Sequence, residues 1–179
     1  AAMLIQSIDS NGDLIRKTPI DSETHKEMTN DFINYYRKNI SGHSTIRKNV
    51  ISLLEWCKKT EIICAVCTNK REDLAIKLLK EINLYKYFDF IAGADTFEFR
   101  KPDPRHLTNI LDILGIEKKN TIMLGDSETD ANTAKAAEVY FVLIKDGYTE
   151  QKLSDIHHDH LIDDFEVVKQ IASKYLNTS

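Results

Sequence analysis

The chain has 179 residues, of which 29% are charged and 42% hydrophobic, with a formal net charge of −4. This composition is typical of a folded globular domain and excludes a disordered chain. The acidic balance argues against nucleic acid as a partner, and no apolar stretch approaches the roughly 20 residues of a membrane-spanning helix. Without a leader-like start, a cytoplasmic location is expected.

Residues 1–45 are predicted to be mainly amphipathic helix. Ala1 to Ile8 is expected to form a short apolar helix or strand, and a turn cluster follows at 9–13. Apolar side chains at three- and four-residue spacing between Met28 and Tyr36 then mark one buried helix face. Gly42 and its neighbours end this helix, so we predict a helical segment distinct from the rest of the chain.

From residue 46 onwards, predicted helices and strands alternate. The helices are expected at 49–59, 72–82, 104–114, 129–137 and 165–176, and the strands at 61–67, 88–92, 121–124, 140–144 and 160–162. Short apolar strands separated by helices of about 10 to 15 residues are typical of a parallel sheet covered by helices on both faces. The fold class predicted from this pattern is α/β.

The cysteines and histidines give weak signals. Cys57, Cys64 and Cys67 lie in apolar segments and are predicted to be reduced, buried thiols. Cys64 and Cys67 have C-x-x-C spacing, but residues three apart in a strand point to opposite faces, which disfavours a redox pair or zinc site. The histidines of 157–160 are interpreted as a surface loop, and His106 as an ordinary polar position.

Polar residues follow three successive predicted strands. Thr68 and Asn69 come after the first, Lys101 lies in a Lys-Pro-Asp-Pro segment after the second, and Asp126 with Asp130 follows the third. The carboxyl ends of parallel strands share one edge of the sheet, so these groups are expected to converge there. A hydroxyl, an ammonium and paired carboxylates suit phosphoryl transfer assisted by Mg²⁺.

Each residue also has a simpler interpretation when taken alone. Thr68 could be a turn residue, Lys101 a solvated surface lysine, and Asp126 the cap of the following helix. The order of all three on successive strand ends favours the functional interpretation.

This set of motifs resembles the haloacid-dehalogenase superfamily, and within it the bacterial phosphoglycolate phosphatases. The resemblance spans roughly residues 28–170. It implies a parallel Rossmann-like sheet with the remnant of a helical cap at 1–45, and a core at 46–179 that lacks its first strand. It further implies that Thr68 and Lys101 are catalytic, that both bind substrate together with Asn69, and that Asp126 and Asp130 bind Mg²⁺.

The first motif of that superfamily, an apolar strand ending in Asp-x-Asp-Gly-Thr, has no clean copy here. The nearest match places Asp9 at the nucleophile, but Asn11 replaces the second Asp and Asp13 the Thr. Without a central strand, its two neighbours must pair with each other, take a strand from residues 1–9, or pair with another chain. A further departure is Glu138, where the family usually has glycine and a left-handed backbone is expected.

The resemblance therefore implies a Mg²⁺-dependent phosphatase of a small phosphorylated metabolite such as 2-phosphoglycolate, acting as a monomer or homodimer, with impaired activity if the nucleophile is absent. A catalytically inactive binding or interaction protein, or a decayed gene product, is the alternative. A phosphomutase or dehalogenase of the same superfamily is a third possibility.

Overall fold

The computed structural model describes residues 2–5, 46–145, 147, 149 and 151–176. Its centre is a six-stranded sheet in the order β3-β2-β1-β4-β5-β6, and every neighbouring pair of strands is parallel. The strands are β1 Ala2–Ile5, β2 Ile63–Cys67, β3 Phe90–Ala92, β4 Thr121–Gly125, β5 Tyr140–Ile144 and β6 His160–Ile162. The α/β fold class predicted from the sequence is confirmed.

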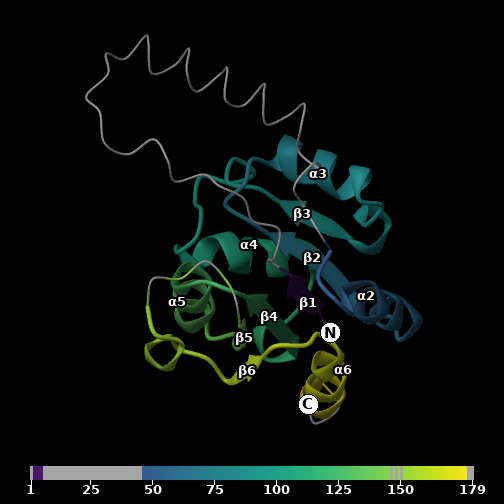
Figure 1. The fold of residues 1–179 in the computed structure, drawn as a ribbon. Helices are drawn as coiled ribbons and strands as arrows, with labels where there is room; N and C mark the ends of the chain where they lie inside the picture. Colours follow the sequence, from purple (N-terminus) through teal and green to yellow (C-terminus); the bar gives the residue numbers. More distant parts are fainter. Residues whose placement is uncertain (1, 6–45, 146, 148, 150, 177–179) are drawn as a thin grey trace. The chain divides into compact units, whose positions relative to one another are not determined.

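Helices cover both faces of this sheet (Figure 1). They are α2 Val50–Lys59, α3 Glu72–Glu81, α4 Pro104–Leu114, α5 Glu128–Ala137 and α6 Glu166–Leu176, with short 3₁₀ turns η1 Tyr85–Tyr87, η2 Lys118–Asn120 and η3 Leu153–Asp155. Helices α4 and α5 pack together on one side, α2 and α6 pack together on the other, and α3 packs along β3. None of the described helices is long and apolar enough to cross a membrane.

The N-terminal residues correct the predicted domain boundary. The sequence analysis placed 1–45 in a cap and left the core without its first strand, but β1 lies between β2 and β4, with Leu4 in register with Ala65 and Met123. Of the three arrangements considered, the chain therefore takes the strand from its own N-terminus. This pairing satisfies backbone groups of β2 and β4 that would otherwise be buried without partners. The cap predicted for the rest of 1–45 lies outside the described residues.

The strand order reverses between β1 and β4, since the chain runs from β1 outward through β2 to β3 and then crosses to β4 on the other side of β1. Strands β2 and β3 extend the sheet on one side of β1, and β4 to β6 extend it on the other. In open α/β sheets, ligands bind outside the carboxyl ends of the strands at such a reversal. The topology therefore directs attention to the loops that follow β1 and β4, of which the loop after β1 lies outside the described residues.

The three cysteines are free and buried, as predicted. Cys67 belongs to the apolar cluster beneath α4 and α5. Cys64 instead hydrogen-bonds Cys57 of α2, which together with burial raises the pKa of its thiol. The two cysteines of the C-x-x-C segment thus face opposite sides of the sheet, so the expectation drawn from strand geometry is confirmed.

Replacing Glu138 with glycine should stabilise the protein. Glu138 ends α5 in a left-handed conformation with φ of 59°, which costs a residue with a Cβ atom about 1 kcal/mol relative to glycine. Its exposed contact with Lys118, 3.6 Å long, contributes little in return. We expect Glu138→Gly to raise the free energy of unfolding in urea by about 1 kcal/mol. Glu138→Ala keeps the Cβ atom, and an equal gain in that variant would contradict the backbone explanation.

Candidate phosphoryl-transfer site

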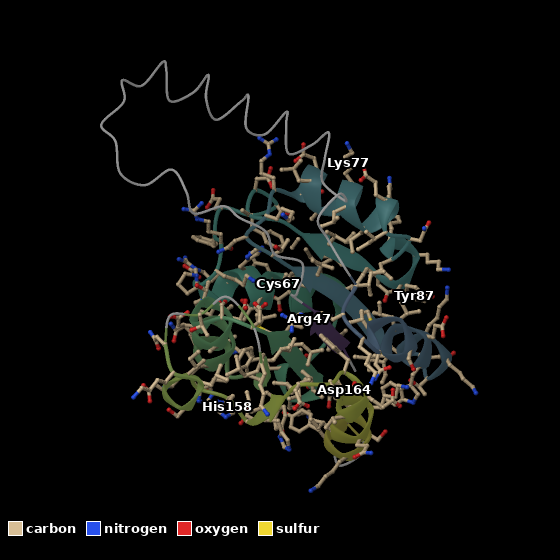
Figure 2. All side chains as sticks on the ribbon, in the orientation of Figure 1. Arg47, Cys67, Lys77, Tyr87, His158 and Asp164 are labelled. Carbon is tan, nitrogen blue, oxygen red and sulfur yellow. The ribbon has the colours of Figure 1, made fainter. Side chains whose placement is uncertain are left out.

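The predicted site residues come from three loops at the carboxyl edge of the sheet. Thr68 directly follows β2, Asp126 directly follows β4, and Lys101 lies in the loop between β3 and α4. Figure 2 labels Cys67, the last residue of β2, in the interior of the molecule near this edge. All three site residues are buried, with exposed fractions of 7% for Thr68, 5% for Asp126 and 2% for Lys101.

A buried ion pair joins the loop of Lys101 to the first turn of α5. The ammonium of Lys101 lies 2.8 Å from Oδ1 of Asp130, and both side chains are fully buried. Oδ2 of Asp130 accepts hydrogen bonds from the Ser127 hydroxyl at 2.7 Å and from the Asp126 backbone N–H at 3.2 Å. Each oxygen of Asp130 therefore has at least one protein donor, and the predicted role of Asp130 in binding Mg²⁺ stays a prediction.

The glycine at the end of β4 makes this arrangement possible. A Cβ atom on Gly125 would lie 2.4 Å from Cβ of Asp130 and 2.8 Å from its Oδ2. Atoms cannot approach so closely, so any larger residue at 125 would displace the carboxylate that holds Lys101. The Gly-Asp pair noted in the sequence therefore has a packing reason as well as a chemical one.

Asn69 connects the β2 loop to the same lysine. Its side-chain Nδ2 donates to the backbone carbonyl of Lys101 at 2.9 Å. The neighbouring Thr68 hydroxyl accepts from the Lys70 N–H at 3.1 Å, and the Thr68 N–H donates to Ala92 at the end of β3. Contacts thus run from the β2 loop through Lys101 and Asp130 to Asp126. The predicted catalytic and substrate-binding roles of Thr68, Asn69 and Lys101 stay predictions.

Two residues that the sequence analysis did not assign to the site also belong to this network. Ser127, rather than Asp126, caps α5, since its side chain accepts from the Asp130 N–H at 3.3 Å. A Ser-x-x-Asp spacing is a capping signal that could have identified it. His106 is fully buried, and its Nδ1 accepts from the Lys101 N–H at 3.3 Å. The interpretation of His106 as an ordinary polar position missed this contact, for which the sequence carries no signal.

The charges of this network affect the thiol beside it. Burial raises the pKa of Cys67 to about 11, while the Lys101 ammonium lowers it and the Asp130 carboxylate raises it. The opposite effects of the two charges show that both lie close to the end of β2. Cys67 is therefore an uncharged thiol at neutral pH and adds no charge to the site.

The donor set can be tested for its fit to Mg²⁺. This ion prefers oxygen ligands and is commonly held by one or two carboxylates together with waters and substrate phosphate. Asp126 and Asp130 both bring carboxylates to this edge of the sheet, and Asp130 contacts Lys101 and Ser127. These residues fit a magnesium ion bound through the Asp126 carboxylate. Asp130 would support that site by accepting a hydrogen bond from the Asp126 backbone N–H and by its ion pair with Lys101. Within the described ranges, no group of three or more His, Cys, Asp or Glu residues could hold a metal ion by itself.

Two histidines of the 157–160 segment make their contacts away from this site. In the 157–160 segment, His158 Nδ1 contacts the Ile156 carbonyl and His160 Nδ1 contacts the Tyr140 hydroxyl. Figure 2 shows His158 well away from Cys67. Asp9, considered as a nucleophile, lies outside the described residues. The described strand β1, Ala2–Ile5, contains no carboxylate.

Acidification should destabilise the protein through His106. Burial, and secondarily the Lys101 ammonium, lower the pKa of His106 to about 4 from its ordinary 6.5. Below about pH 6.5 the unfolded chain binds a proton that the folded protein accepts only near pH 4. The contribution of neutral His106 is therefore complete above pH 6.5 and is lost as the pH falls towards 4. We expect this loss to be on the order of 3 kcal/mol.

Urea unfolding measured at several pH values across that window tests this expectation. His106→Asn removes the titrating group, so its free energy of unfolding should fall less steeply on acidification than that of the wild type. Equal slopes for the two proteins would contradict a role for His106 in the pH dependence.

Comparison with known proteins identifies similar sequences and folds. The family model of haloacid dehalogenase-like hydrolases matches residues 5–144. The phosphoglycolate phosphatase of Mesorhizobium japonicum is 36% identical over 149 residues, which cover 83% of this chain and 66% of that protein. That of Agrobacterium fabrum is 36% identical over 151 residues, covering 84% and 65% respectively. The chain thus spans about two thirds of the length of these curated relatives.

Solved structures show the same architecture. A crystal structure described as a predicted phosphoglycolate phosphatase from Haemophilus somnus superposes with a TM-score of 0.81 at 25% identity, covering 85% of this chain and 68% of that one. A haloacid-dehalogenase-superfamily hydrolase from Geobacter sulfurreducens gives a TM-score of 0.68 at 21% identity, covering 85% and 74%. The second likeness concerns the fold alone.

Proposed function

This chain belongs to the haloacid dehalogenase-like hydrolase family, and from that premise we propose that it acts as a Mg²⁺-dependent phosphatase on a small phosphomonoester. Curated proteins 36% identical to this chain are named phosphoglycolate phosphatase, which makes 2-phosphoglycolate the first substrate to test. The single observation that carries the proposal is the buried Lys101–Asp130 ion pair, in which the Lys101 carbonyl accepts from Asn69 and the Asp130 carboxylate accepts from the Asp126 N–H.

A buried ammonium is well suited to an anionic substrate. Lys101 is held by Asp130 at 2.8 Å in a region from which water is largely excluded. Its positive charge there interacts with a phosphate more strongly than it would in bulk water. Because the position of the ammonium is already determined before substrate binds, little reorganisation is needed as charge develops on the transferred group.

The β2 loop supplies polar groups for the same anion. The Thr68 hydroxyl can donate its proton to a phosphate oxygen while it continues to accept from Lys70. Asn69 fixes the Lys101 carbonyl, and so keeps the two loops together around a bound phosphate. A magnesium ion bound through Asp126 would supply further charge neutralisation for the phosphate. The described residues thus bind and orient the ester, and Asp9 remains a candidate nucleophile by resemblance alone.

Phosphate binding without turnover is the second candidate function. It is favoured by the sequence after β1, where Asn11 and Asp13 stand in place of the second Asp and the Thr of the family's first motif. Asn cannot donate and accept a proton as a carboxyl group does in acid–base catalysis. Such a protein would bind the anion at Lys101 and Asp126 but release no product.

Phosphate release and phosphate binding, measured on the same preparation, separate these two functions. The phosphatase proposal expects Mg²⁺-dependent phosphate release from 2-phosphoglycolate that stops when the metal is chelated. Calorimetric titration with inorganic phosphate then reports binding directly. Binding without release from any of a panel of small phosphomonoesters would support the second candidate, and neither binding nor release would refute both.

A further inference from the structure

His106 is an unusual residue for its position. It lies in the first turn of α4 and is fully buried. Its Nε2 makes no hydrogen bond of good geometry among the residues that the structure describes, although an interaction of the imidazole with the Gly93 backbone partly offsets the lowering of its pKa. A buried polar atom whose hydrogen bonding is incomplete is unfavourable, so an apolar side chain would fill this space at lower cost. The presence of histidine therefore calls for an explanation in terms of its other nitrogen.

That other nitrogen contacts the central lysine of the site. Nδ1 of His106 accepts from the backbone N–H of Lys101 at 3.3 Å. The carbonyl of the same residue accepts from Asn69 at 2.9 Å, and its ammonium contacts Asp130 at 2.8 Å. Lys101 is thus held at its amide, its carbonyl and its ammonium by three different parts of the chain.

The imidazole ring is itself held in place. The ring of Phe97 meets it edge to face, with centroids 5.8 Å apart and an interplanar angle of 79°, and Phe97 in turn stacks against Phe90 at 6.5 Å. Aromatic packing of this kind restricts rotation of the ring. Burial and the Lys101 charge lower the pKa of His106 to about 4, which keeps the imidazole neutral and Nδ1 available as an acceptor near neutral pH.

We infer that His106 is a positioning residue, which fixes the backbone of Lys101 through Nδ1 and thereby sets where the lysine ammonium lies at the sheet edge. The ammonium is connected to that backbone by a flexible four-carbon chain. Asp130 can hold it in one place only if the backbone is in the right place as well. The effect on catalysis rests on the proposed function, whereas the effect on Lys101 rests on the contacts alone.

Two matched variants test this inference. In His106→Asn the amide oxygen takes the approximate place of Nδ1, so the acceptor is retained. In His106→Phe the ring is retained and both nitrogens are lost. Nuclear magnetic resonance of ¹⁵N-labelled protein reports the Lys101 backbone amide and, because it is buried, the Lys101 ammonium. We expect both signals to move in His106→Phe and to stay close to the wild-type positions in His106→Asn.

Kinetics provide a second measurement. With 2-phosphoglycolate and Mg²⁺, we expect kcat to fall about tenfold in His106→Phe, to stay within about threefold in His106→Asn, and KM to change little in either. A loss of kcat that Asn restores indicates positioning through the acceptor. If kcat in the two variants instead falls in proportion to their loss of stability, whether or not the acceptor is retained, the inference is overturned.

The outcomes separate this inference from the proposed function. Unchanged Lys101 signals in His106→Phe, or equal changes in both variants, would refute positioning whatever the activity. A wild type without turnover would refute the phosphatase proposal, while the Lys101 signals still decide the role of His106. If His106→Phe does not fold, the inference can be tested on the wild type alone. We expect a ¹⁵N–¹⁵N coupling across the hydrogen bond between the Lys101 amide and His106 Nδ1, and its absence would contradict the inference.

Discussion

Replacing Lys101 with methionine is expected to destabilise the folded protein by about 3–5 kcal/mol, because Asp130 would be left as a buried charge without its cation. The ammonium and the carboxylate are 2.8 Å apart and both side chains are fully buried. Methionine fills much of the same volume, so the loss would come from the missing charge more than from a cavity. The free energy of unfolding in urea, followed by circular dichroism, measures this effect.

Two controls isolate the charge. Lys101→Met combined with Asp130→Asn removes both charges and keeps a side-chain oxygen for Ser127 and for the Asp126 N–H, so it should recover much of the lost stability. Lys118→Met removes a half-exposed lysine and should change stability by no more than about 0.5 kcal/mol. If Lys101→Met cost no more than Lys118→Met, the buried ion pair would contribute nothing to the fold.

Replacing Asp126 with asparagine is expected to lower kcat/KM for 2-phosphoglycolate by at least about 100-fold while the protein stays folded. Asparagine has nearly the shape of aspartate but lacks the negative charge that a magnesium ion requires. The hydrogen bond from residue 126 to Asp130 uses the backbone N–H, so it is retained. Phosphate release at several Mg²⁺ concentrations measures this effect, and the loss should persist at the highest of them.

An exposed carboxylate serves as the matched control. Asp163 contacts Lys145 at 3.5 Å and is 69% exposed, so Asp163→Asn should leave turnover unchanged. If the wild type binds phosphate without turnover, the increase in its free energy of unfolding on adding Mg²⁺ is measured in place of activity. That increase should be absent in Asp126→Asn. Full activity of Asp126→Asn would exclude this residue as the metal ligand.

Much of the fold could be predicted because its signals are local. Helix α4 begins at Pro104 and ends before Gly115, as predicted, since Asp103 caps its first turn and Gly115 takes the left-handed conformation that ends it. The apolar runs of β5 and β6 likewise matched the predicted strands. Other boundaries moved by one or two residues, because the ends of an element depend on hydrogen bonds that a hydrophobic pattern does not contain.

The central strand could not be predicted in the same way. Ala2–Ile5 is too short for a periodic pattern, and its role depends on pairing with β2 and β4, which lie far along the chain. The resemblance also directed attention to a motif that this sequence does not contain, and so favoured a core without its first strand. Partners distant in sequence, rather than the composition of the four residues, make this segment a strand.

The sequence by itself determined the fold class and the set of polar residues at one sheet edge, since the alternation of strands and helices and the order of Thr68, Lys101 and Asp126 can be read along the chain. Only the tertiary structure decided how those residues are used. It assigned Asp130 to the Lys101 ammonium, Ser127 to the helix cap and His106 to the Lys101 amide. The physical reason is that burial and hydrogen-bond pairing depend on which distant side chains share the same volume, and this information is absent from the spacing of residues.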